Sequence, residues 1–180
     1  MEDFVDFWEF QYNYRLAPPD TKKPDPELLY TDNIGQPLTS ARIHELFEWK
    51  NGSVLSAQKR RSVEQHFVAH VPKVNALPQS TNAEQFLLEE FPYGGAIWRI
   101  FWLHCWQPSR FPIYDQHVHR AMVFIEQQLL EEIPKQDTEK VQQYLTRYLP
   151  FHQKFQGINQ RSLDKALWAY GKFIKANRFP

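Results

Sequence analysis

The stretch that decides the fold is FLLEEFPYGGAIWRIFWLHCW, residues 86–106. Pro92 and the pair Gly94-Gly95 interrupt a helical pattern at one point, and two adjacent glycines allow a tight turn and a close approach of two backbones. From Ile97 to Trp106 the side chains are apolar on nearly every side of a helix, which is typical of a buried helix. The pattern therefore predicts helix, tight turn and a central buried helix.

The next stretch, QPSRFPIYDQHVHRAM at residues 107–122, predicts a proline-punctuated loop followed by a third helix. Asp115 follows Pro112 and stands where an N-cap residue belongs. Val118, Met122, Ile125 and Leu129 recur at helical spacing, so this helix is expected to run to about residue 133, before Pro134.

Helices are expected on both sides of this centre because capping residues precede apolar runs of helical period. Val63 and Phe67 are expected to face inward, Pro150 is expected to end a helix, and Asp164 is expected outside on the last helix. The expected caps and spans are Thr39 or Ser40 to Lys50, Ser56 to His70, a cap at 80–82, Asp137 or Thr138 to Pro150, and Asn159 onward. No convincing alternating strand appears, so the predicted class is all-α.

The N-terminal part combines an acidic, aromatic segment, residues 1–16, with a Pro-rich loop at residues 17–26. We expect the first segment to be helical. It either covers the core or forms a stacking or partner-docking surface. The predicted organisation is a single compact domain: residues 1–38 pack on a helical domain, 39–180, whose helix-hairpin-helix element lies near 86–106.

Composition limits the function classes. The chain has 180 residues, of which 42% are hydrophobic, and 21 basic residues balance 21 acidic ones. Zero formal charge gives no global attraction to nucleic acid, although a local basic patch is compatible with it. The lone Cys105 cannot form an internal disulfide, which favours a reducing, cytoplasmic setting. Neither a signal peptide nor a membrane span is predicted.

The hairpin, the apolar helix after it and the segment Pro112-Ile113-x-Asp115-x-His117-Val118-x-Arg120 together resemble the helix-hairpin-helix DNA glycosylase superfamily. The resemblance covers the middle fifth of the chain. It implies that hairpin amides at Tyr93, Gly94 and Gly95 grip a DNA phosphate, and that Asp115 assists base excision.

Two departures from the family pattern shape this expectation. Tyr93 stands where the family has its first hairpin glycine, and Ile97 stands where bifunctional members have a catalytic lysine. A Schiff-base lyase step is therefore not expected. One cysteine also excludes the family's cysteine-ligated iron–sulfur cluster, so no cofactor is expected.

In this reading the Asp115 carboxylate stabilises positive charge on the sugar or orients a water while an extruded nucleotide occupies a pocket. The expected pocket residues are Trp98, Tyr114 and His117. The alternative is that Asp115 is only a helix cap and that these aromatic residues belong to the core.

A basic cluster accompanies the site. Lys59, Arg60 and Arg61 begin one predicted helix, and Arg110 lies in the loop before Asp115. These side chains either form a solvated face or contact phosphate groups.

No metal site is expected, because His117 and His119 point away from each other on a helix.

The sequence leaves three functions open. The first is a DNA-binding glycosylase without lyase activity. The second is a non-enzymatic helical protein that keeps the hairpin for protein contact or structural DNA binding. The third is an unrelated bundle in which Gly94-Gly95 is only a tight turn.

Overall fold

The structure is a computed structural model that describes residues 1–14, 25–155 and 157–177. Over these ranges it contains helices, turns and loops and no strand, which confirms the all-α class. Most of the predicted Pro-rich loop, and Arg178 at the C-terminus, lie outside the described residues. Within the described ranges no helix has both the length and the apolar character that crossing a membrane requires.

The chain forms two compact units. Unit 1 comprises residues Met1–Asn13, Gly95–Ile100 and Phe111–Pro180. Unit 2 comprises Tyr14–Gly94 and Phe101–Arg110. The division expected after residue 38 lies inside unit 2.

The helices of unit 2 begin largely where the capping residues predict. Its elements are α2 (Leu28–Thr31), α3 (Ser40–Asn51), α4 (Ala57–His66), η1 (Val68–His70), α5 (Val71–Asn75) and η2 (Gln85–Glu90). The Thr39 and Ser56 side chains accept hydrogen bonds from the first turns of α3 and α4, and the Asn82 carboxamide accepts one from the Gln85 amide. Each bond satisfies an amide that the helix itself leaves unpaired.

Aromatic rings form the core of unit 2. The Phe47 ring lies 4.5 Å from the Phe67 ring and 5.4 Å from the Phe101 ring, measured between centroids, and Trp102 is fully buried beside Phe67. Offset and edge-to-face ring pairs stabilise a core beyond their buried area. Val63 and Phe67 face inward as the spacing predicts.

Helix α6 (Ala96–Trp106) contains the most apolar stretch of the chain and contributes residues to both units. Ile100, Phe101, Trp102 and Leu103 have no exposed surface, which confirms the buried helix. Burial also raises the pKa of the Cys105 thiol far above its ordinary value, so this thiol stays protonated.

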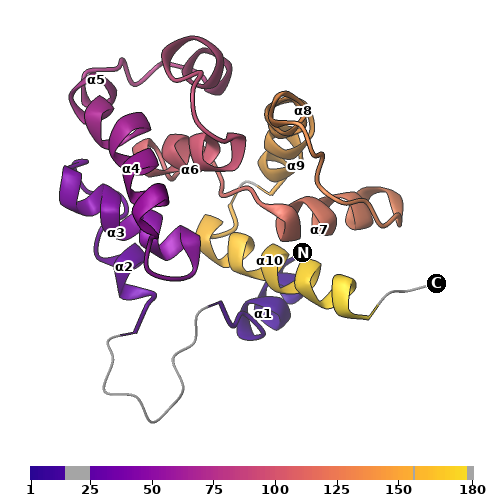
Figure 1. The fold of residues 1–180 in the computed structure, drawn as a ribbon. Helices are drawn as coiled ribbons and strands as arrows, with labels where there is room; N and C mark the ends of the chain where they lie inside the picture. Colours follow the sequence, from indigo (N-terminus) through magenta and orange to yellow (C-terminus); the bar gives the residue numbers. More distant parts are fainter. Residues whose placement is uncertain (15–24, 156, 178–180) are drawn as a thin grey trace. The chain divides into compact units, whose positions relative to one another are not determined.

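Unit 1 is built on the last helix of the chain. Its other elements are α1 (Glu2–Phe10), α7 (Gln116–Gln127), α8 (Asp137–Gln143), η3 (Tyr144–Tyr148), α9 (Leu149–Gln153) and α10 (Gln160–Ala176). Helix α10 contacts α7 along one side and α1 along another, and Figure 1 shows it between them. The expected N-terminal helix is confirmed, and Trp8 packs on Tyr170 and Phe173 of α10.

The contact between α7 and α10 requires a glycine. A Cβ atom on Gly171 would lie 1.9 Å from the carbonyl oxygen of His117, which no side chain can tolerate. Gly171 therefore sets the closeness of the two helices, next to the start of α7.

The structure corrects two predicted helix ends. Helix α7 stops at Gln127 instead of residue 133, because Gln128 adopts a left-handed conformation with φ 59° and donates its amide to the Phe124 carbonyl. Leu129, whose spacing placed it in this helix, lies beyond the helix end and is 58% exposed. Helix α4 stops at His66 instead of His70, because Phe67 leaves the helical conformation.

Two prolines also behave differently from the prediction. Pro150 does not end its helix, because the preceding π-helical turn lets Pro150 occupy the first turn of α9, where its missing N–H is not needed. Pro72 was expected to begin a short loop that Pro78 ends, but it lies in the first turn of α5.

The predicted exposure of Asp164 is wrong. The side chain is buried on α10, 3.6 Å from the Nε2 atom of the buried His152. The facing atoms, Asp164 Oδ1 and His152 Nε2, are buried and are too far apart for a hydrogen bond.

Candidate functional site

The start of α7 places Asp115 at a fixed position. The Oδ1 atom of Asp115 accepts hydrogen bonds from the amides of His117, at 2.8 Å, and Val118, at 3.2 Å. The predicted N-cap is therefore confirmed. The carboxylate is half-buried and lies at the N-terminal end of the helix.

His117 lies beside this carboxylate in the first turn of α7. Its ring centroid is 5.0 Å from that of Trp168 on α10, and its Nδ1 atom is buried without a hydrogen-bond partner. Burial lowers the pKa of His117, while the charge of Asp115 acts in the opposite direction. The imidazole is therefore held mainly neutral next to an anionic group.

Tyr114 and His119 anchor the start of α7 from inside unit 1. Both side chains are fully buried, and the Tyr114 hydroxyl lies 2.8 Å from the Nδ1 atom of His119. The Nε2 atom of His119 lies 3.2 Å from Glu131, which also contacts Arg147. Burial lowers the pKa of His119 and raises that of Tyr114, so both groups are neutral at pH 7.

Arg120 ties α7 to α10. Its guanidinium is 1% exposed, donates to the carbonyl of Gly171 at 3.0 Å and contacts Glu132 at 2.6 Å. A buried guanidinium needs such partners, because an unpaired buried charge is very costly. Arg120 thus links α7 to α10 within two turns of Asp115.

The predicted hairpin residues divide between the units. Tyr93, 76% exposed, and Gly94, with φ 98°, belong to unit 2, while Gly95 begins the α6 segment of unit 1. The positive φ at Gly94 explains why glycine stands there. Trp98 is half-buried in the first turn of α6.

The first amide of α6 already has an anionic partner. The Ala96 amide donates to the carboxylate of Asp137, which also contacts Lys140 at 2.8 Å. Partial burial tends to raise the pKa of Asp137, but these hydrogen bonds and the charge of Arg99 lower it overall. A carboxylate of the chain therefore takes the place that a bound anion would take at this helix end.

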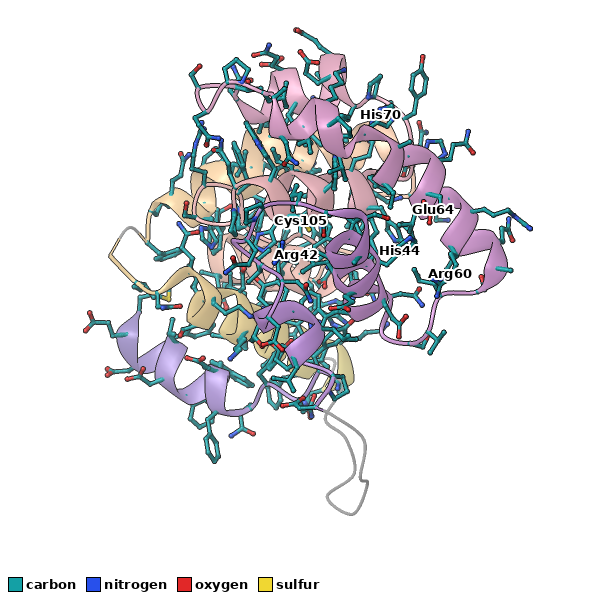
Figure 2. The ribbon with its side chains drawn as sticks, turned by 90° about the vertical axis from the view of Figure 1, so that its left-hand side faces the viewer. Arg42, His44, Arg60, Glu64, His70 and Cys105 are labelled. Carbon is teal, nitrogen blue, oxygen red and sulfur yellow. The ribbon has the colours of Figure 1, made fainter. Side chains whose placement is uncertain are left out.

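The other predicted basic residues lie in unit 2. Arg60 and Arg61 are exposed on α4, and the Lys59 ammonium donates to the Asn51 side chain at 2.5 Å. Figure 2 shows Arg60 one turn before Glu64, whose carboxylate lies 2.6 Å from His44 on α3. Arg110 donates to the side chain of Gln107 at 2.6 Å and to the backbone carbonyl of Gln79.

A second set of basic residues, on α10, is absent from the sequence-based site. Lys172 and Lys175 are exposed, and Lys172 lies over the ring of Trp168, the residue that contacts His117. The sequence pattern could have indicated this set, because basic residues and a tryptophan recur every three or four positions from residue 161 to residue 175, which places them on one side of a helix.

A comparison of the chain with protein-family models, with curated proteins and with solved structures found no match.

Proposed function

We propose that this chain is a DNA-binding hydrolase that cleaves the N-glycosidic bond of an extruded nucleotide, with Asp115 as the charge-stabilising group. The proposal includes a helix-hairpin-helix role for residues 86–106. Its main support is the fixed Asp115 carboxylate, which uses Oδ1 for the helix cap and stands beside the neutral imidazole of His117.

In the proposed reaction the bond between sugar and base breaks, and its electron pair leaves with the base. Positive charge then develops on the sugar, and a carboxylate held by two backbone amides stabilises it without reorganising. Water adds its hydroxyl to the sugar carbon and its proton goes to the base. No amine attacks the sugar, because Ile97 occupies the position of the family's catalytic lysine.

The proposed contacts to DNA are the backbone near Tyr93, Gly94 and Gly95, and the cations Lys59, Arg60, Arg61 and Arg110. Trp98 and His117 are the proposed residues that meet the base in the pocket. Burial of Tyr114 gives it a supporting position behind Asp115 instead of a surface that meets the base. The single buried thiol, Cys105, suits a reducing, cytoplasmic setting.

One observation favours a second function, a non-enzymatic scaffold for protein or DNA contact. The Ala96 amide binds Asp137, so an incoming phosphate has to displace an internal carboxylate that lies close to Lys140. A scaffold needs no such displacement.

Product analysis separates the two functions. Labelled duplexes carrying a panel of damaged bases are incubated with the protein, and free base and strand breaks are measured separately. The hydrolase releases base and leaves an abasic strand that breaks only after alkali. Strand cleavage without alkali would contradict the proposed hydrolysis. If no duplex releases a base, the hydrolase is contradicted and the non-enzymatic scaffold is the function that remains.

A further inference from the structure

One face of α10 carries four cations and a tryptophan in a single row. Arg161, Lys165, Trp168, Lys172 and Lys175 follow one another at intervals of four, three, four and three residues. This spacing places them on one side of a helix. We call this row the α10 basic face.

Aromatic rings alternate with the cations on this face. The Lys172 ammonium lies 4.9 Å from the centre of the Trp168 ring, and the Tyr12 ring stands edge-on to Trp168 at 5.3 Å. Arg161 and Lys165 in turn lie 5.3 Å and 5.7 Å from the centre of the Tyr12 ring. Interleaved cations and aromatic rings are characteristic of grooves that follow a nucleic-acid strand.

The carboxylates near the α10 basic face include Glu9 and Glu132, and the charge of Lys175 helps to lower the pKa of Glu132. Glu9 lies 3.5 Å from Lys165, and Lys172 contacts the neutral side chain of Asn13 at 2.8 Å. The charges of Lys172 and Lys175 also contribute to the lowered pKa of His117, after burial and the charge of Arg120. The face therefore keeps a local positive field although the whole chain has zero formal charge.

The α10 basic face leads to the proposed reaction centre. The Trp168 ring is 5.0 Å from the ring of His117, and the charge of Asp115 acts on that same imidazole. These residues all belong to unit 1, and Gly171 and Arg120 hold the two helices together at this point. A DNA strand that lies along α10 would thus pass close to the Asp115 carboxylate.

We propose that the α10 basic face binds the phosphate backbone of DNA, with Trp168 stacking on an unpaired base. This inference deepens the proposed function, because it gives the DNA a surface in the same unit as Asp115. Phosphate contacts by lysines release counterions, so each contact adds about 0.9 to the slope of log affinity against log salt on duplex DNA.

The test is a salt titration of binding to a duplex with an abasic analogue and to a single strand of equal length, followed by fluorescence anisotropy. In the double variant Lys172→Gln/Lys175→Gln the duplex slope should fall in magnitude by about 1.8. The matched control is Lys135→Gln/Lys154→Gln, which removes two exposed charges elsewhere in unit 1. The control should keep the wild-type slope.

Trp168→Ala should weaken binding to the single strand about tenfold, and Trp168→Phe should restore most of that loss, because a ring still stacks. Thermal melts of each variant show that the loss occurs in folded protein. Equal slopes in the α10 and control variants, or no binding by the wild type at low salt, overturn the inference.

Base release is measured on the same preparations. Binding that depends on Lys172 and Lys175 without any base release supports the α10 basic face and contradicts the hydrolase. Base release with an unchanged slope in the α10 variant supports the hydrolase and overturns the α10 basic face.

Discussion

At the scale of single residues, Gly171 is the position where the fold leaves least room. Gly171→Ala places a methyl group against the His117 carbonyl, so α7 and α10 have to separate. We expect the free energy of unfolding to fall by about 3 kcal/mol, at the upper end of overpacking costs. Chemical denaturation measures this change.

Gly95→Ala is the matched control for that substitution. A Cβ atom on Gly95 would lie 4.0 Å from the Asp137 carboxylate, an ordinary contact, and Gly95 has no positive φ. Its free energy of unfolding should change by less than about 1 kcal/mol. Equal losses in the two variants would contradict the close approach at Gly171.

At the scale of elements, α7 makes stability depend on pH. Burial lowers the pKa of both His117 and His119 below the ordinary value of 6.5. The unfolded chain therefore takes up protons first as pH falls, and the free energy of unfolding decreases below about pH 6.5. One such histidine contributes at most about 1.4 kcal/mol per pH unit.

Denaturant titrations at several pH values check this expectation in the wild type and in His119→Gln. The slope of unfolding free energy against pH between pH 7 and pH 5 should be smaller in the variant. Identical slopes would show that His119 does not contribute.

Helix starts were predictable from sequence because a capping bond involves neighbouring residues only. The confirmed caps are Thr39, Ser56, Asn82, Asp115 and Asn159. Helix ends were less predictable, since Gln128 is not a residue type that normally adopts positive φ. The passage of a helix through Pro150 depends on a π-helical turn that no residue signals.

The candidate site was predictable only in part for the same reason. Asp115 and His117 are neighbours along the chain, so their proximity follows from the sequence. The contact of His117 with Trp168 joins residues fifty-one positions apart and depends on the close packing at Gly171. Pairing of Asp164 with His152 is likewise a tertiary contact, which is why its burial was missed.

At the scale of the whole molecule, zero formal charge and local basic faces coexist. The proposed DNA contacts depend on where cations lie, not on their excess over the carboxylates. Binding should therefore be weak and sensitive to salt, as phosphate contacts by a few side chains require.

The most direct measurement is single-turnover base release by wild type and Asp115→Asn on one susceptible duplex. The asparagine oxygen still accepts the bonds from His117 and Val118, so the melting temperature and DNA binding should stay close to those of the wild type. Loss of the negative charge should slow base release about a hundredfold or more. Equal rates for the two folded proteins would contradict the role of Asp115.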